Sequence, residues 1–413
     1  RSIIIAALSK SASVIRNPLL SGDCLSTINC FRKLGVKIKI SKSELSVSAS
    51  TGENGTYRTF RKPSGSLDCG NSGTTMRLLS GIMAAQPFTS RLTGDHSLSS
   101  RPMKRVIAPL MQMGAKISAR NQQFAPLKVT GNPHLKHINW KSPVASAQVK
   151  SCVLLAGLFA RGKTTYQEPY RSRDHSERML KSVGANIQDS RSKLFQTHRV
   201  AISGGVPLAG LRISVPGDSS SAAFFAAAAI LVQGSMLKIK DVNLNPTRTG
   251  LLETLKKSGA HIKVSNVRTL AGDPVGTLTV RAGAIKAFRL NHSQMPHLVD
   301  EVPILAVLAT QAQGTTIISG AEELRLKESD RLSAITRELR KMGAKIQEKK
   351  DGLIIRGPST LHGADVDAHD DHRIAMSLAV ASLIARGTTR VKGFDSVRIS
   401  FPGFLTELKK VMR

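Results

Sequence analysis

The stretch Met342-Gly343-Ala344-Lys345-Ile346 closes one helix-like segment and opens a short β-prone one. A glycine after a segment that carries Lys or Arg in its last turn is typical of a helix C-cap, because glycine takes the left-handed conformation at little cost. The phrase recurs around Gly35, Gly114, Gly184 and Gly259, and Phe404 to Val411 begins a further copy that stops. The recurrence predicts a unit that is used several times.

A second phrase alternates with the first: an Ala/Leu-rich helical segment, a glycine and then a β-prone strand. Its copies are marked by Gly162, Gly234, Gly314 and Gly387, with looser ones near Ser11 and Pro87. Copies lie about 75 residues apart, so six units account for the chain. Because each unit alternates helices and strands, the fold class is α/β or α+β.

Two helical segments differ from the rest in being apolar all round. These are 222–231 (AAFFAAAAIL) and 304–310 (ILAVLAT), and we expect both to be buried in domain centres. The segment 251–258 is amphipathic and should lie on the outside. Three units per domain predict a boundary near Val215-Pro216-Gly217, hence two similar domains, 1–215 and 216–413, with a ligand cleft between them.

Composition excludes several classes of protein. The 413 residues are 41% hydrophobic and 21% charged, which is ordinary globular usage and argues against wholesale disorder. Four sparse cysteines indicate reduced thiols in a cytoplasmic protein. No apolar run reaches the roughly 20 residues that a membrane span needs, and no signal peptide is convincing.

The net charge of +32 raises nucleic acid as a partner. Binders of single strands usually add stacking aromatics, yet aromatic residues are 4% here and Lys and Arg are scattered. We therefore interpret the charge as a generally cationic surface, with nucleic acid an unlikely partner. An anionic small-molecule site would use some of this charge but does not explain all of it.

Polar clusters that interrupt the repeats are the candidate site. The Gly-rich turn Gly70–Arg77 (GNSGTTMR) enters a helix and could bind an anion, or could be a structural cap. Ser99–Met103 (SSRPM) is a second cluster. Ala145–Lys150 (ASAQVK) is a third cluster, and its alternative interpretation is a capped helix. Ser172–Arg178 (SRDHSER) is a fourth, and its alternative interpretation is a solvated first turn of a helix.

Three further clusters carry carboxylates. Asp300-Glu301 stand at the mouth of a buried helix, where a carboxylate is costly unless it is paired or functional. In Arg325–Arg331 (RLKESDR), Lys327 and Arg331 would share one face of a helix and suit one anion, the alternative being an exposed ion-pair ladder. The segment 369–376 (HDDHRIAM) hints at metal, but no third ligand set has the right spacing, so we predict no metal.

The inventory of these clusters is Arg, Lys, Ser and Gln with a few carboxylates. Motifs for a serine nucleophile, a zinc protease or a dinucleotide are absent from the sequence. This inventory is typical of a site that binds multiply anionic small molecules and transfers protons without a cofactor.

Six of these motifs, in this order, resemble the 5-enolpyruvylshikimate-3-phosphate synthase family: GNSGTTMR, LTGDHSLSSRPM, SRDHSERML, DEVPILAVLA, RLKESDRL and DHRIAMS. The resemblance covers the whole chain. It implies two domains of three βαβαββ units each. It also implies transfer of the enolpyruvyl group of phosphoenolpyruvate to the 5-hydroxyl of shikimate-3-phosphate, with release of phosphate, by a cytoplasmic monomer that needs no cofactor.

The resemblance also implies roles for individual residues. Asp300 would be the base for the 5-hydroxyl, and Glu328 would help proton transfer at the methylene carbon. Shikimate-3-phosphate would be held by Arg1, Ser146, Gln148, Arg173, Asp300 and Lys327. Phosphoenolpyruvate would be held by Asn71, Gly73, Arg101, Gln148, Arg331, Arg373 and, more loosely matched, Arg398.

Two features bear on activity. The family has a Lys-Ser pair shortly before the arginine that matches Arg1, so we expect a segment upstream of this sequence, without which catalysis would be impaired. A residue bulkier than Gly73 is associated with glyphosate tolerance in the family, so we expect glyphosate sensitivity.

Two other functions stay open at this point. One is the related UDP-N-acetylglucosamine enolpyruvyl transferase, which uses a loop cysteine that none of the four cysteines here matches. The other is a catalytically dead cationic binding protein on the same scaffold.

Overall fold

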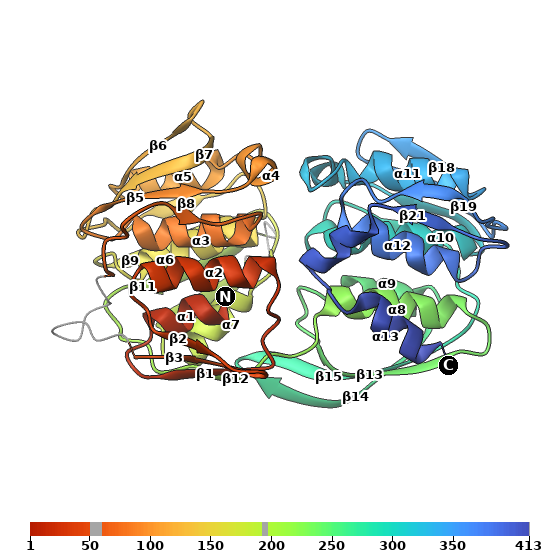
Figure 1. Cartoon of the computed structure of the whole chain (residues 1–413), viewed down its shortest axis with the longest axis horizontal. Helices are drawn as coiled ribbons and strands as arrows, with labels where there is room; N and C mark the ends of the chain where they lie inside the picture. The colour runs from red at the N-terminus through yellow and green to blue at the C-terminus, as the bar shows by residue number, and fades with distance from the viewer. Residues whose placement is uncertain (50–59, 192–196, 413) are drawn as a thin grey trace. The chain divides into compact units, whose positions relative to one another are not determined.

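The chain forms two compact units in the computed structural model, which describes residues 1–49, 60–191 and 197–412. One unit comprises Arg1–Val215 with Leu270–Asp273, and the other comprises Pro216–Thr269 with Pro274–Arg413. Both units combine helices with small mixed sheets (Figure 1), so the predicted α/β class is confirmed. The division of each unit into three repeats stays a prediction.

The helices and strands of the first unit alternate from its first residues. Its described helices are α1 (Ser2–Leu8), α2 (Gly22–Lys33), α3 (Gly73–Met83), α4 (His96–Ser99), α5 (Lys104–Gln112), α6 (Ala147–Gly157) and α7 (His175–Ser182). Its described strands are β1 (Ser13–Arg16), β2 (Ile38–Ile40), β3 (Glu44–Val47), β4 (Leu67–Asp68), β5 (Thr89–Thr93), β6 (Lys116–Arg120), β7 (Phe124–Thr130), β8 (Asn139–Lys141), β9 (Lys163–Glu168), β10 (Ile187–Arg191), β11 (His198–Ser203) and β12 (Arg212–Ser214).

The second unit contains α-helices, short 3₁₀ helices and strands. The helical segments are α8 (Ser219–Leu231), α9 (Gly250–Lys257), η2 (Met295–His297), η3 (Val299–Glu301), α10 (Val302–Gln311), η4 (Glu322–Leu326), α11 (Arg331–Lys341), α12 (His372–Ser382), η5 (Phe394–Ile399) and α13 (Phe404–Val411). The strands are β13 (Met236–Asn243), β14 (His261–Leu270), β15 (Asp273–Arg281), β16 (Arg289–Leu290), β17 (Gly314–Ile318), β18 (Lys345–Lys349), β19 (Gly352–Gly357), β20 (Asp365–Asp367) and β21 (Arg390–Lys392).

Four of the sheets share one topology. Their strand orders are β12-β1-β3-β2, β4-β5-β7-β6, β8-β9-β11-β10 and β16-β17-β19-β18. In each, the first pair is parallel and the two others are antiparallel. The same order of hydrogen-bonded strands therefore recurs in both units, as expected when one sequence phrase recurs.

The glycines of the two sequence phrases stand at helix-to-strand connections. All nine have a positive φ, between 77° at Gly234 and 108° at Gly314. This is the region that L residues with a side chain rarely adopt, so the predicted reason for glycine at these positions is confirmed.

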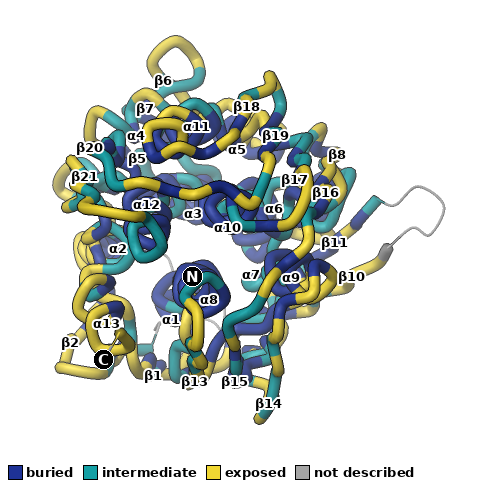
Figure 2. The backbone as a smooth tube through the Cα atoms, turned by 90° about the vertical axis from the view of Figure 1, so that its right-hand side faces the viewer, coloured by how far each residue is buried: buried dark blue, intermediate teal, exposed yellow. Residues whose placement is uncertain are grey.

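Buried helices form the centre of each unit. In the second unit, α8 and α10 are apolar all round, and every residue of α10 from Val302 to Thr310 is buried, as predicted. Figure 2 shows α8 dark blue. In the first unit, α3 packs against α6. Helix α9 is amphipathic as predicted: Leu251 and Leu255 are buried while Lys256 is exposed.

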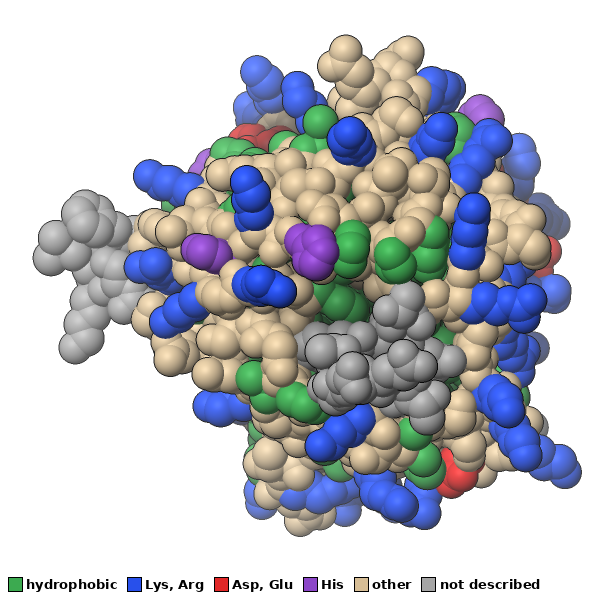
Figure 3. Space-filling view, turned by 90° about the vertical axis from the view of Figure 1, so that its left-hand side faces the viewer, with side chains coloured by type: hydrophobic (Ala, Val, Ile, Leu, Met, Phe, Trp, Pro, Cys, Tyr) green, Lys and Arg blue, Asp and Glu red, His purple; other side chains and the backbone are tan. Residues whose placement is uncertain are grey.

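The surface is rich in Lys and Arg. On the face shown in Figure 3 the cationic side chains are spread widely and few acidic side chains accompany them. This distribution fits the predicted generally cationic surface. The four cysteines are free thiols, Cys30, Cys69 and Cys152 being buried.

Candidate active site

The first cluster in the first unit is the turn before α3. Ser72 caps this helix, since its side chain accepts a hydrogen bond from the Thr75 amide at 3.2 Å. Asn71 Nδ2 donates to Asp95 Oδ2 at 2.7 Å, and Asn71 Oδ1 accepts from Arg101 Nη2 at 2.9 Å. The structure thus brings Arg101 against the glycine-rich turn, with its cation next to the start of a helix, where anions are favoured.

Gly73, the first residue of α3, lies in a confined position. A Cβ added there would lie 2.8 Å from Arg77 Nη1 and 3.7 Å from Arg101 Nη1. Arg77 Nη1 donates to Gln148 Oε1 at 2.6 Å, and Gln148 Nε2 donates to Thr74 Oγ1 at 2.9 Å. Gln148 is therefore fixed from both sides by residues of α3. Arg77 was present in the quoted motif, but nothing in the sequence pattern singled it out.

The start of α6 carries Ser146 and Gln148. Ser146 caps the helix, its Oγ accepting from the Val149 amide at 3.4 Å. The cap interpretation of this segment is correct, and it is compatible with a binding role because Gln148 lies within the first turn. Lys150, one turn beyond Ser146, is wholly buried.

Arg173 lies half-buried in the loop between β9 and α7. Three buried charged side chains, Glu168, Lys150 and Glu177, support this loop. Glu168 Oε1 accepts from the Ser172 amide at 2.9 Å, and Glu168 Oε2 accepts from Ser172 Oγ at 2.7 Å. Lys150 Nζ donates to Glu168 Oε1 at 2.8 Å and forms an ion pair with Glu177 Oε1 at 2.9 Å. The segment is thus largely buried, and its interpretation as a solvated helix turn is wrong.

The pKa values of Lys150, Glu168 and His198 favour their charged forms, whereas burial raises the pKa of Glu177. Burial by itself raises the pKa of Glu168, but the contacts with His198 and Lys150 outweigh it and hold that pKa at about 2. Burial likewise opposes the charge of Lys150, yet the two carboxylates keep its pKa above the ordinary value. His198 places Nδ1 3.2 Å from Glu168 and Nε2 2.6 Å from Asp189, and its pKa is raised in spite of burial.

Arg1 reaches the same region from the start of the chain. Its Nε donates to Ser176 Oγ at 2.9 Å, and Ser176 Oγ lies 2.7 Å from Ser151 Oγ on α6. Hydrogen bonds through α6 therefore connect Arg1, Ser146 and Gln148 with one another and with Ser172, the residue before Arg173.

In the second unit, Arg331 gathers three carboxylates. Its side chain is 2% exposed. Nε donates to Asp371 Oδ2 at 2.7 Å, Nη2 to Glu328 Oε2 at 2.6 Å and Nη1 to Asp300 Oδ1 at 3.3 Å. Burial alone lowers the pKa of Arg331, but the three carboxylates outweigh it and raise that pKa. The alternative of an exposed ion-pair ladder is therefore wrong for this residue.

Arg373 joins the same group at the start of α12. Its Nη1 donates to the Asp300 carbonyl oxygen at 3.3 Å, and its Nη2 lies 3.8 Å from Asp300 Oδ2. Asp371 caps α12, accepting from the Arg373 amide at 2.9 Å. Two expected anion-binding arginines and the two expected proton-transfer carboxylates, Asp300 and Glu328, thus lie together.

Lys327 does not share a helix with Arg331, so that prediction is wrong. The 3₁₀ helix η4 ends at Leu326, and Lys327 has an extended backbone. Asp330 then caps α11 by accepting a hydrogen bond from the Ser333 amide. A new helix therefore starts between Lys327 and Arg331, and the two residues do not share a helical face. Lys327 Nζ instead lies 3.4 Å from Glu323.

Arg398 stands apart from the other expected arginines of this unit. Its side chain is 80% exposed and pairs at 3.4 Å with Asp395, which is also exposed. The structure therefore does not bring Arg398 to the group around Arg331, in keeping with its loose match to the family motif.

The two histidines of the last motif have separate surroundings. His369 Nε2 lies 2.9 Å from Glu338 Oε1. His372 is buried, and burial together with the adjacent Arg373 lowers its pKa to about 4, so it is neutral near pH 7. Across residues 1–49, 60–191 and 197–412, no group of three His, Cys, Asp or Glu side chains could hold a metal ion.

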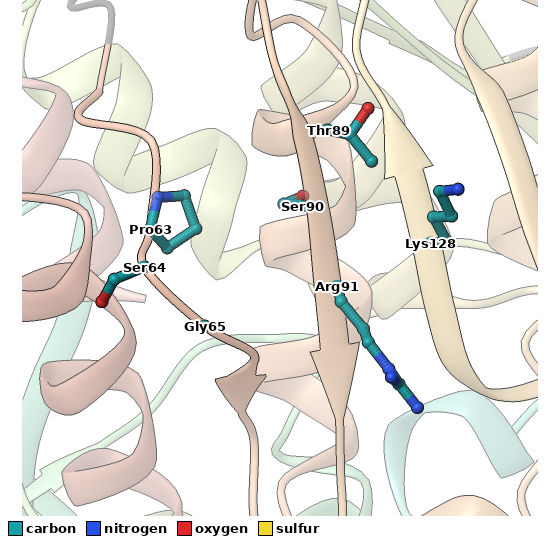
Figure 4. Close-up of a pocket in the computed structure, with 7 residues that line it drawn as sticks. All are labelled: Pro63, Ser64, Gly65, Thr89, Ser90, Arg91 and Lys128. Atoms are coloured by element: carbon teal, nitrogen blue, oxygen red, sulfur yellow. The ribbon is translucent and has the colours of Figure 1, made fainter.

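A cavity of about 370 Å³ lies on the first unit. Figure 4 shows its lining from two strands and a loop: Pro63, Ser64, Gly65, Thr89, Ser90, Arg91 and Lys128. None of the expected site residues lines it. In the same described part of the chain, no helix is both long and apolar enough to cross a membrane.

Comparisons with known proteins bear on this arrangement. A model of the family EPSP synthase (3-phosphoshikimate 1-carboxyvinyltransferase) matches residues 1–408. The 3-phosphoshikimate 1-carboxyvinyltransferase of Thermoanaerobacter sp. strain X514 is 48% identical over 404 residues, which are 98% of this chain and 92% of that protein. The enzyme of that name from Geobacillus kaustophilus strain HTA426 is 46% identical over 415 residues, covering 100% and 94%.

A solved structure agrees with these sequences. EPSP synthase from Acinetobacter baumannii superposes with a TM-score of 0.87 at 38% identity, covering 99% of this chain and 92% of that one. The chain therefore belongs to the EPSP synthase family. Membership confirms the expected enzyme class, a carboxyvinyl transferase of the shikimate pathway in aromatic amino-acid biosynthesis. Neither alternative function is favoured by these matches.

Proposed function

We propose that this enzyme transfers the enolpyruvyl group of phosphoenolpyruvate to the 5-hydroxyl of shikimate-3-phosphate through the two groups of residues described above. The observation that carries the proposal is the meeting of Asp300 and Glu328 with Arg331 and Arg373. Carboxylates that can move protons stand there beside guanidinium groups that can hold a phosphate and a carboxylate.

In this proposal the acceptor is held mainly by the first unit. Arg1, Ser146, Gln148 and Arg173 bind shikimate-3-phosphate, with Lys327 and Asp300 added from the second unit. The hydrogen bonds from α6 to the Arg173 loop and to Ser176 support this assignment, because they fix the expected ligands relative to one another.

Phosphoenolpyruvate is assigned to arginines of both units. Arg101, next to Asn71 and Gly73, supplies one cation, and Arg331 and Arg373 supply two more. Gln148 contacts both substrates. Arg398 belongs to the proposal only through its position in the sequence, since its exposed side chain gives it no support.

The chemical steps are an addition followed by an elimination. Asp300 takes the proton of the 5-hydroxyl as that oxygen attacks C2 of phosphoenolpyruvate, while the methylene carbon C3 gains a proton with the help of Glu328. In the elimination, C3 loses a proton, the C2–O bond to phosphate breaks and the double bond re-forms. Arg331 and Arg373 stabilise the negative charge on the departing phosphate.

The finer features of fold and setting belong to the same proposal. Each unit is built of three βαβαββ repeats, and the enzyme works as a cytoplasmic monomer without a metal or organic cofactor. The recurrence of one sheet topology in both units supports the repeats.

The test is phosphate release by the full-length protein supplied with both substrates. We expect release that requires shikimate-3-phosphate and that falls about 100-fold or more in Asp300→Ala, the size of a general-base contribution. Asp365→Ala is the matched control, because Asp365 is an exposed aspartate of the same unit that pairs only loosely with Arg390. Release supported by UDP-N-acetylglucosamine, or full activity in Asp300→Ala, would contradict the assignment.

A further inference from the structure

One group of buried charges in the first unit has no role in the reaction described so far. Lys150, Glu168 and Glu177 are buried, and His198 completes the group as the cross-strand partner of Glu168 in the β9–β11 pair. Taking such charges out of water is expensive, and well-packed apolar side chains of similar volume are often at least as stable. The cost therefore calls for a purpose other than stability.

The contacts of Lys150 indicate that purpose. Its Nζ donates to Glu168 at 2.8 Å and to the carbonyl oxygen of Ser172 at 3.1 Å. Glu168 in turn accepts from both the amide and the hydroxyl of Ser172. The residue that directly precedes Arg173 is thus held at its amide, hydroxyl and carbonyl groups by one buried ion pair.

Lys150 also belongs to the helix that presents the other ligands. It stands one turn after Ser146 on α6, and Ser151, the next residue, lies 2.7 Å from Ser176, to which Arg1 donates. The first two turns of α6 therefore fix the Arg173 loop through Lys150 and the Arg1 side chain through Ser151.

We propose that Lys150 and Glu168 are positioning residues for shikimate-3-phosphate: they hold Arg173 in register with Ser146 and Gln148. The inference rests on the proposed function for the identity of the substrate. Because the residue that they position, Arg173, is assigned to shikimate-3-phosphate alone, losing them should affect one substrate and spare the other.

The test compares the KM values of the two substrates. Lys150→Met alone would leave the buried Glu177 carboxyl group without its ion-pair partner, so the variant is the pair Lys150→Met with Glu177→Gln. We expect the KM for shikimate-3-phosphate to rise about tenfold or more, the effect of misplacing one charge-assisted hydrogen bond. The KM for phosphoenolpyruvate and kcat should stay within about threefold.

Two controls separate positioning from loss of stability. Leu127→Ala creates a cavity in β7 of the same unit and should lower thermal stability while leaving the KM for shikimate-3-phosphate unchanged. Glu168→Gln keeps the shape of the side chain but removes its charge, and it should reproduce the selective rise if the double variant does not fold. The fluorescence of Trp140, the sole tryptophan, on β8 of the Glu168 sheet, reports folding.

A double-mutant cycle with Arg173→Ala asks whether Lys150 acts through Arg173. In that background the Lys150 and Glu177 changes should add little to the KM for shikimate-3-phosphate, because the group that they position is gone. Fully additive effects, an equal rise for both substrates, or no rise in a folded variant would each overturn the inference.

Failure of the proposed function would be observed in the unsubstituted protein rather than in the variants. If that protein releases no phosphate, the function is wrong. Calorimetric titration with shikimate-3-phosphate then still tests the positioning role, since it requires no turnover. Binding that is tenfold weaker in the variant than in the unsubstituted protein supports the role. Equal binding by the two proteins, or no binding by the unsubstituted protein, overturns it.

Discussion

Arg331 and Asp371 form a buried ion pair, with Nε and Oδ2 2.7 Å apart and side chains that are 2% and 0% exposed. Asp371 also starts α12 by capping it, so one carboxylate fixes both a guanidinium and a helix terminus. The pair gives Arg331 a single orientation, with Nη1 and Nη2 directed at Asp300 and Glu328.

Asp371→Asn should separate these two roles. Asparagine is as good an N-cap as aspartate, so α12 keeps its start while Arg331 loses a buried countercharge. We expect a loss of about 3 kcal/mol or more in the free energy of unfolding, measured by urea denaturation, together with a higher KM for phosphoenolpyruvate. Asp330→Asn is the control: it caps α11, but its side chain is 39% exposed, and it should cost about 1 kcal/mol or less. Equal costs for the two variants would contradict this account.

Gly73→Ala should weaken inhibition by glyphosate more than it weakens catalysis. The added Cβ would lie 2.8 Å from Arg77 Nη1, so the Arg77 guanidinium must move and disturb its bond to Gln148. We expect the enzyme with Gly73 to be glyphosate-sensitive, and the variant to need about tenfold more inhibitor for half inhibition, which corresponds to about 1.4 kcal/mol. Dose–response curves at a fixed phosphoenolpyruvate concentration measure this. Full activity of the unsubstituted enzyme at inhibitor levels that stop a glycine-bearing relative would disprove the expectation.

Stability should fall as the pH rises above 6.5, through His198. Its folded pKa is raised above the ordinary 6.5, so its contribution is fully present below that value and is lost as the pH passes through the folded pKa. The slope of the urea midpoint against pH should be flatter in His198→Gln over this range. An identical slope in the variant would mean that His198 is not the titrating group.

At acidic pH, the contribution of Glu168 to stability should have the opposite pH dependence to that of His198. Its pKa is lowered from 4.5 to about 2, so the stability it supplies is present above pH 4.5 and is lost as the pH falls towards 2. In Glu168→Gln, less stability should be lost between pH 4.5 and 2 than in the unsubstituted protein. Acid-unfolding curves followed by Trp140 fluorescence provide the comparison, and parallel curves would refute it.

The cationic surface should bind polyanions without specificity. Lys and Arg are spread over the face in Figure 3, so we expect retention on immobilised DNA that drops steeply between about 50 and 200 mM salt and does not depend on sequence. Phosphate release at 200 mM salt should be unaffected by added DNA. Retention that persists at high salt, or a strong preference for one sequence, would revive a nucleic-acid-binding function.

The sequence predicted the elements better than the contacts between them. The glycine phrases located the helix ends because a left-handed residue leaves a local signal, and all nine marked glycines have a positive φ. The sequence also located the clusters around Ser146, Asp300 and Arg373, because hydroxyl and charged residues that precede an apolar helical segment can be recognised from sequence alone.

Other parts of the site depend on contacts that the sequence does not display. The four-residue spacing of Lys327 and Arg331 suggested one helix, but Asp330 caps a new helix between them. Lys150 belongs to a segment that the sequence predicted to be a capped helix, with no role for Lys150 itself. Glu168 lies in a strand whose sequence has no unusual pattern. Their importance comes from the pairing of β9 with β11 and the packing of α6, which are long-range contacts.

Ser146 caps α6 and Gln148, Lys150 and Ser151 lie in its first two turns, which has a consequence for how this stretch can change. An α-helix rotates by about 100° per residue, so inserting or deleting one residue between 147 and 150 would swing every later side chain to a different face. The cap, the link to α3, the ion pair under the Arg173 loop and the contact with Ser176 could not all survive. A substitution here removes one of these contacts, whereas a change of length should disrupt several of them at once.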